Sequence, residues 1–157
     1  MSFRELGLHA AFADRCEHLG YVEPTPIQKQ AIPIVLRGGD VIACAETGTG
    51  KTAAFLLPIL NHQVQHLNER GLRVLILSPT RELTTQIEAA CRQFLPEGVT
   101  CAAIIGGAGY AKQIDALKKG VNILIATPGR LIDFMERGMI DFKGLQTLVL
   151  DEADRML

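Results

Sequence analysis

The sequence predicts an α/β domain built on a parallel β-sheet, and three observations carry this prediction. Short apolar runs rich in β-branched residues recur at residues 41–44, 73–78, 99–105, 122–126 and 147–150. Continuous apolar runs of this length are typical of strands that are buried on both faces of a sheet. Helical patterns separate them, and polar residues follow most of the runs directly. Alternating strands and helices favour βαβ units and therefore a parallel sheet.

The helical patterns between the predicted strands cover residues 50–67, 82–94, 109–118 and 129–137. The first forty residues differ, because they read as two helices, at residues 8–18 and 26–37. Pro26 suits the first position of a helix, with Thr25 as its N-cap. Gly38 and Gly39 then end that helix before the first predicted strand.

Composition indicates one soluble domain. The chain has 157 residues, of which 48% are hydrophobic and 21% charged. A net charge of −1 excludes recognition of nucleic acid by a bulk positive field, so any such binding must depend on local geometry. The four cysteines have no metal-like spacing, no signal peptide is evident, and no run approaches the roughly 18 apolar residues of a membrane span. We expect a cytoplasmic protein with reduced thiols and no contact with membranes.

Residues 45–52 form the most informative stretch, because they combine glycines, a lysine and a threonine between a predicted strand and a predicted helix. The stretch reads Ala45, Glu46, Thr47, Gly48, Thr49, Gly50, Lys51 and Thr52. Glycines let backbone N–H groups converge on a polyphosphate, and the following helix presents its positive end. Lys51 can then reach the β- and γ-phosphates, and the Thr52 hydroxyl can bind Mg²⁺. The alternative is an ordinary surface loop rich in glycine and threonine.

Polar residues that follow parallel strands should lie along one edge of the sheet, where ligands of such sheets bind. Asp151 follows the last predicted strand and is suited to hold Mg²⁺ together with Thr52, directly or through water. Glu152 could orient or deprotonate an attacking water. The alternative is that these acids only cap a helix N-terminus, where negative charge is favourable.

Several motifs in order show that the chain resembles the DEAD-box family of ATP-dependent RNA helicases. Asp151-Glu152-Ala153-Asp154 spells the family name, and residues 45–52 match motif I. Residues 79–83 match motif Ia, Gly106-Gly107 with Gln113 match the double-glycine motif, and residues 127–130 match motif Ib. Residues 20–28 look like the Q motif, with Phe3 as its upstream aromatic residue. The resemblance covers essentially the whole chain.

The resemblance implies ATP and Mg²⁺ as cofactors and RNA as the partner, bound through its sugar–phosphate backbone. Gln28 would read adenine, since a carboxamide can donate to one edge atom and accept from another. Tyr21 would stack on the base, and Pro26 belongs to the same segment. The residues expected to contact RNA are Pro79, Thr80, Arg81, Glu82, Gly106, Gly107, Thr127, Pro128, Gly129 and Arg130.

The resemblance also implies a RecA-like P-loop domain. We expect residues 1–157 to be part of an N-terminal RecA-like lobe, with a Q-motif region at 1–39 and a P-loop core at 40–157. The family's second lobe would be absent. The leading hypothesis is the ATP-binding lobe of an RNA-dependent ATPase that locally unwinds duplexes.

Two alternatives remain. One is a fragment that binds nucleotide and RNA without turnover, because the family's Ser-Ala-Thr motif (motif III) and its second lobe would be missing. The other is a different P-loop class such as a nucleotide kinase, in which Gln28 and residues 79–82 would have no role. We also expect self-association through an open edge of the sheet beside residues 148–150.

Overall fold

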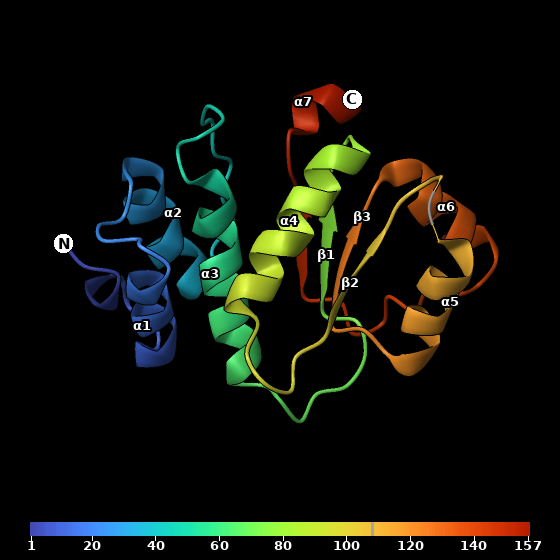
Figure 1. Ribbon diagram of the computed structural model, residues 1–157, viewed down its shortest axis with the longest axis horizontal. Coiled ribbons are helices and arrows are strands. Elements are labelled where there is room, and N and C mark those ends of the chain that lie inside the picture. The colour runs from blue at the N-terminus through green and yellow to red at the C-terminus, as the bar shows by residue number, and fades with distance from the viewer. Residues whose placement is uncertain (108) are drawn as a thin grey trace. The chain divides into compact units, whose positions relative to one another are not determined.

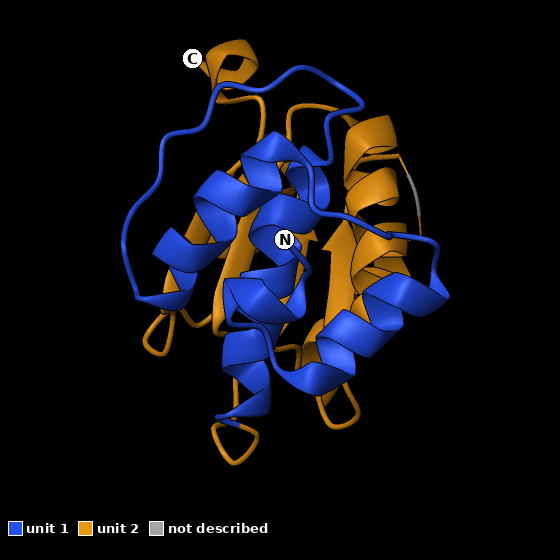
Figure 2. Cartoon of the chain, turned by 90° about the vertical axis from the view of Figure 1, so that its left-hand side faces the viewer, with its two compact units in different colours: residues 1–66 blue, residues 67–157 orange. Residues whose placement is uncertain are grey.

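The computed structural model describes residues 1–107 and 109–157. The chain divides into two compact units, residues 1–66 and residues 67–157, called here the first and the second unit (Figure 2). The first unit is helical within the described residues, whereas the second holds the sheet. Within the described part of the chain, no helix has the length and apolar character needed to cross a membrane.

The second unit contains a four-stranded sheet in which every pair is parallel, as the sequence predicts (Figure 1). Its strands are β1 (Val74–Leu77), β2 (Cys101–Ile104), β3 (Ile123–Ala126) and β4 (Thr147–Leu150), in the order β2-β3-β1-β4. Leu77 lies opposite both Ala126 and Leu150, and Ile104 lies opposite Ala126. All four strands therefore end at the same level.

Both faces of the central strands are covered. The helices of the second unit are α4 (Arg81–Phe94), α5 (Tyr110–Lys119), α6 (Pro128–Glu136) and the short α7 (Ala153–Met156). Side chains on one face, including Leu75 and Leu124, form a core with Leu131 and Phe134 of α6, and part of α5 packs against it. Successive residues of a strand point to opposite faces. Cys101 therefore faces away from this core, and it contacts Cys91 of α4.

Helix α4 shows why such segments are helical. Its buried residues Thr84, Ile87, Cys91 and Phe94 recur at intervals of three and four, which places them on one face. Thr80 caps the helix, because its Oγ1 accepts a hydrogen bond from the Leu83 N–H at 3.1 Å. Removing such a cap typically costs about 1 kcal/mol of stability.

The first unit consists of η1 (Arg4–Leu6), α1 (Ala10–His18), α2 (Pro26–Leu36) and α3 (Lys51–Val64). Helices α2 and α3 pack together and bury Ile32, Leu56, Leu57 and Leu60. The predicted helices at residues 8–18, 26–37 and 50–67 are thus confirmed with slightly shorter bounds.

The predicted strand at residues 41–44 is wrong. This segment has no regular secondary structure, and Ile42 is 99% exposed. The physical reason is that a strand exists only through hydrogen bonds to a neighbour, and an apolar run without such a neighbour has no ladder to join. The phosphate loop therefore follows an irregular segment instead of a strand, although its helix is present.

Candidate functional site

Three polar residues continue the sheet register just beyond the strand ends of the second unit. The Ser78 N–H donates to the Ala126 carbonyl at 3.0 Å, and the Thr127 N–H donates to the Ile104 carbonyl at 3.2 Å. The Asp151 N–H donates to the Leu77 carbonyl at 2.9 Å. The polar residues that follow β1, β3 and β4 therefore lie along one edge of the sheet, as the sequence predicts.

The loops after β1 and β2 meet at Arg81 and Gly107. Gly107 adopts a φ of 75°, which favours glycine. A Cβ atom at this position would lie 2.9 Å from Nη1 of Arg81, so the arginine rests directly against the glycine backbone. Gly106 precedes it in the same turn. The structure thus brings together two of the segments that the sequence assigns to RNA binding.

The loop after β3 is joined to the loop after β2 through Gln113. The Gln113 amide donates to the Ile105 carbonyl at 3.0 Å, while its Oε1 accepts from Arg130 at 3.5 Å. Arg130 lies in the first turn of α6, which begins at Pro128 with Thr127 at the N-cap position and Gly129 next. Gln113 is buried and positions the arginine through the backbone of a neighbouring loop.

Arg81 and Arg130, the two arginines at this edge of the sheet, are not neutralised by a carboxylate within the described residues. Elsewhere in the second unit, Arg73, Arg92, Arg137 and Arg155 each form an ion pair with a carboxylate. Within the described residues, neither Arg81 nor Arg130 pairs with a carboxylate. Helix N-termini and unneutralised guanidinium groups are the usual means of binding phosphates. The edge is therefore suited to an anionic ligand.

Asp151 and Glu152 differ in environment. Asp151 is buried at the end of β4. Glu152 adopts φ 51° and ψ 50°, and it has the one positive φ found for a non-glycine residue in the described part of the chain. Its carboxylate accepts a hydrogen bond from Arg155 at 2.7 Å. A left-handed conformation costs such a residue roughly 1–2 kcal/mol, and strain of this kind concentrates at functional sites.

Residues 45–52, the predicted phosphate loop, lie in the first unit. Gly48 and Gly50 have φ of 87° and 83°, so the loop needs glycine at both positions. The Thr49 hydroxyl donates to the Glu46 carbonyl at 2.6 Å and closes the turn. Lys51 and Thr52 are the first two residues of helix α3, and a helix N-terminus favours anions. Ala45 and Thr47 complete the loop.

Gln28 connects the start of helix α2 to this loop. Its side chain is fully buried; Oε1 accepts from the Thr25 N–H at 2.9 Å, and Nε2 donates to the Gly50 carbonyl at 3.0 Å. These two contacts use one lone pair and one N–H of the carboxamide. Pro26 begins α2, and Tyr21 is partly exposed before it. The sequence did not reveal that Gln28 contacts the loop.

Burial and a thiol–thiol hydrogen bond shift the pKa values of three cysteines. Burial raises the pKa of Cys16 to about 11. The pKa of Cys91 is raised mainly by its hydrogen bond with Cys101 and, to a smaller extent, by burial. The same hydrogen bond lowers the pKa of Cys101. Among the described residues, no group of three or more His, Cys, Asp or Glu could hold a metal ion.

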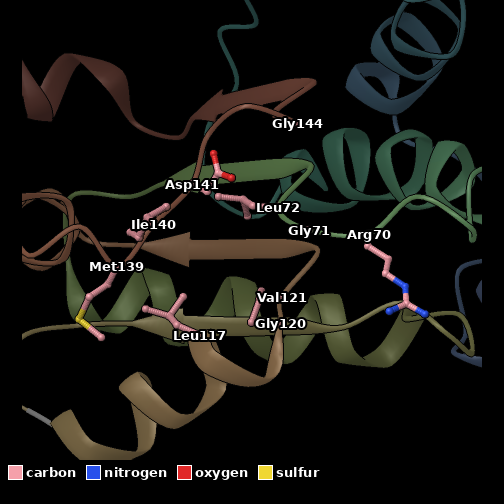
Figure 3. Close-up of a pocket in the computed structure, with 10 residues that line it drawn as sticks. All are labelled: Arg70, Gly71, Leu72, Leu117, Gly120, Val121, Met139, Ile140, Asp141 and Gly144. Carbon is pink, nitrogen blue, oxygen red and sulfur yellow. The ribbon is translucent and has the colours of Figure 1, made fainter.

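The second unit also has a cavity at the opposite end of its strands, with a volume of about 250 Å³ (Figure 3). Gly71 and Leu72 precede β1, and Gly120 and Val121 precede β3, so the cavity lies by the amino ends. Its remaining lining residues are Arg70, Leu117, Met139, Ile140, Asp141 and Gly144. None of the predicted site residues lines it.

Comparison with known proteins gives the class of this chain. Residues 25–157 match the family model described as DEAD/DEAH box helicase. The fold matches the RNA helicase Prp28 from Chaetomium thermophilum bound to ADP, with a TM-score of 0.91 and 46% identity, covering 99% of this chain and 39% of that one. The four-stranded parallel sheet of the second unit, with its flanking helices, thus matches a RecA-like helicase lobe. The chain belongs to the DEAD/DEAH box helicase family.

Two curated relatives make the comparison more specific. The chain is 46% identical over 158 residues to the ATP-dependent RNA helicase DeaD of Klebsiella pneumoniae, covering 99% of this chain and 24% of the relative. It is 45% identical to the protein of the same name from Escherichia coli strain K12, with coverage of 99% and 25%. The chain therefore spans about a quarter of the length of these relatives.

Proposed function

We propose that this chain is the ATP-binding lobe of an RNA-dependent ATPase that locally unwinds RNA duplexes with energy from ATP hydrolysis. The observation that carries the proposal is the phosphate loop. Two glycines with positive φ lead directly into the 14-residue helix α3, and Lys51 is its first residue. The backbone N–H groups of residues 48–52 would surround the β- and γ-phosphates, and Lys51 would neutralise their charge.

Thr52 and Asp151 are the residues that we assign to Mg²⁺, as the family resemblance implies. Thr52 offers a hydroxyl and Asp151 a carboxylate, the hard oxygen ligands that Mg²⁺ prefers. When bound, Mg²⁺ neutralises the charge that develops on the phosphates. We assign Glu152 to the attacking water; it follows Asp151 directly, and its carboxylate accepts a hydrogen bond from Arg155 at 2.7 Å. These assignments agree with the roles that the family resemblance implies.

The edge of the sheet in the second unit is proposed to bind RNA. Arg81 and Arg130 supply positive charge, and Thr80 and Thr127 stand at the starts of two helices. Pro79, Glu82, Gly106, Gly107, Pro128 and Gly129 shape these loops. Contacts to phosphate and sugar fix the position of a strand without reading its sequence, so we expect binding to be insensitive to base sequence.

The test of the nucleotide assignment uses Gln28. We expect the chain to prefer ATP over GTP, because guanine presents an acceptor where adenine presents the N6 donor. Gln28→Ala and Gln28→Glu should each weaken adenine binding by about 1–3 kcal/mol. Gln30→Ala, on the exposed side of the same helix, is the matched control and should leave affinity unchanged. Equal affinities for ATP and GTP in the unmutated chain would contradict the assignment.

A second measurement separates turnover from binding. ATP hydrolysis with and without RNA is compared for the 157-residue chain and for a protein in which this chain is part of both complete lobes of the family. RNA-stimulated turnover only in the longer protein would support the alternative that this chain alone binds without hydrolysing. A nucleotide kinase would transfer phosphate to a small acceptor in either case.

We further propose that a second copy of this chain pairs with β4. This strand lies at the end of the sheet order, and Leu148 and Leu150 are 54% and 49% exposed. An apolar strand at a sheet edge is a template for association. Light scattering should show dimers or larger species, and Leu148→Lys should shift the chain to monomer. A monomeric unmutated chain at high concentration would refute the pairing.

A further inference from the structure

Aromatic rings hold the side chain of Arg130. Its guanidinium carbon lies 4.9 Å from the centroid of the Tyr110 ring and 5.7 Å from that of Phe134. The two rings are 5.2 Å apart and tilted by 54°. Stacking of this kind engages the flat face of a guanidinium and restricts its orientation, while its N–H edge stays open to a ligand.

A second arginine against the same ring provides a contrast. The guanidinium carbon of Arg137 lies 5.2 Å from the Tyr110 centroid, but its Nε also donates to the Asp133 carboxylate at 3.1 Å. Arg130 pairs with no carboxylate among the described residues, and its one polar partner there is the neutral amide of Gln113 at 3.5 Å. Of the two arginines, one is neutralised and the other keeps its charge for an anion.

The surroundings of Tyr110 show that the ring, and not the hydroxyl, is what this arrangement uses. Within the described residues the Tyr110 hydroxyl is buried without a hydrogen-bond partner. A buried hydroxyl without a partner is unfavourable, so it gives no reason for tyrosine here. The ring, in contrast, packs against the fully buried Phe134 and lies beside the Arg130 guanidinium.

We propose that Tyr110 is a positioning residue for RNA binding: its ring holds the Arg130 guanidinium in the orientation that receives an RNA phosphate. Phe134 supports that ring from the core, and Gln113 fixes the arginine from the side of the Ile105 carbonyl. The inference rests on the proposed function of the same edge. It goes beyond the helicase motifs, because neither Tyr110 nor Phe134 was singled out by the sequence.

The test measures binding of the 157-residue chain to fluorescein-labelled single-stranded decauridylate. Arg130→Ala should weaken binding by roughly ten-fold, as expected for one lost charge-assisted contact. It should also reduce the slope of log affinity against log salt concentration by about 0.7, the value for one phosphate on a single strand. Tyr110→Leu should give most of both effects, whereas Tyr110→Phe should keep normal affinity and slope.

A double-mutant cycle shows whether Tyr110 acts through Arg130. The combination of Tyr110→Leu and Arg130→Ala should bind no more weakly than Arg130→Ala alone, since the same contact is already lost. If the loss of affinity in the double variant equalled the product of the two single losses, Tyr110 would not act through Arg130. Normal affinity in Tyr110→Leu would also overturn the positioning role. An unaltered affinity in Arg130→Ala, or no binding by the unmutated chain, would instead count against the proposed RNA function of this edge.

A measurement without RNA distinguishes failure of the positioning role of Tyr110 from failure of the proposed RNA function. It also shows whether the variant is still folded. The heteronuclear NOE of the Arg130 Nε–H group reports how rigid the guanidinium is. It should be high in the unmutated chain and in Tyr110→Phe, and should fall in Tyr110→Leu while the backbone amides of α6 keep their NOE values. An equally rigid Arg130 side chain in Tyr110→Leu would overturn the inference whatever the RNA affinity.

Discussion

The phosphate loop of the first unit and the loops at the sheet edge of the second unit are held in place by different means. Each loop of the second unit continues a strand, and the hydrogen bonds of Ser78, Thr127 and Asp151 extend the sheet register into it. The phosphate loop follows no strand in the described structure. It is held by the Gln28 side chain at the Gly50 carbonyl and by the start of α3.

Because of this difference, we expect the two sites to respond differently to substitutions. In the second unit, many backbone hydrogen bonds and a buried core share the support of each loop. In the first unit, one buried carboxamide connects the loop to helix α2. Substitutions near the phosphate loop should therefore act strongly through single contacts, whereas those near the sheet edge should act through charge and side-chain position.

The largest expected effect compares one residue from each unit. In a protein that carries this chain within both complete lobes of the family, Glu152→Gln should slow ATP turnover by about 10²–10⁴-fold, the range for a lost general base. Its ATP affinity should stay nearly normal, because shape and hydrogen bonding are kept. Lys51→Ala should lower both affinity and turnover, because it removes charge next to the phosphates. Loss of nucleotide binding in Glu152→Gln would contradict its assignment to the attacking water.

The second prediction concerns the buried thiol of the first unit. The pKa of Cys16 is about 11 in the folded chain against an ordinary 9.0, so the folded state holds this proton more tightly. The resulting stability is complete below pH 9 and is lost as the pH rises towards 11. The loss amounts to roughly 2–3 kcal/mol at most. Urea unfolding across this range should show a smaller fall for Cys16→Ala; equal falls would argue against the burial of an ionisable thiol.

The third prediction separates the two glycines of the phosphate loop. Both have positive φ, so alanine at either costs roughly 1–2 kcal/mol in backbone strain. At Gly48 nothing lies within 4 Å of the added Cβ, whereas at Gly50 the Cβ collides with Nε2 of Gln28. Gly50→Ala should therefore weaken ATP binding and stability by about 1 kcal/mol more than Gly48→Ala, the value of one hydrogen bond. Calorimetric titration and thermal melts measure both; identical losses would mean that Gln28 does not hold the loop.

The smallest expected effect tests backbone strain in the second unit. Glu152→Gly and Glu152→Ala both remove the carboxylate and its contact with Arg155, but only glycine accepts φ 51° without cost. Glycine relieves the backbone strain, but it also raises the conformational entropy of the unfolded chain, which lowers stability by a slightly smaller amount. Glu152→Gly should therefore be about 0.5 kcal/mol more stable than Glu152→Ala. Denaturant midpoints compare the two variants. A less stable Glu152→Gly would show that the left-handed conformation is not maintained in solution.

The sequence by itself determined the parallel sheet, its helices and the edge on which the polar residues of the second unit gather. These follow from local signals, because apolar runs and helical periodicity reflect burial on one or both faces. Thr80 and Pro26 likewise mark helix starts through short-range chemistry. The family motifs then indicated the family, which the comparisons confirm.

Tertiary structure decided the features that depend on partners distant in the sequence. Residues 41–44 have the composition of a strand but no ladder in the described structure, since a strand needs a hydrogen-bonded neighbour that composition does not specify. The hydrogen bond from Gln28 to the Gly50 carbonyl joins residues 22 positions apart. The stacking of Arg130 on Tyr110 joins two helices, and only the packing of the core brings those side chains together.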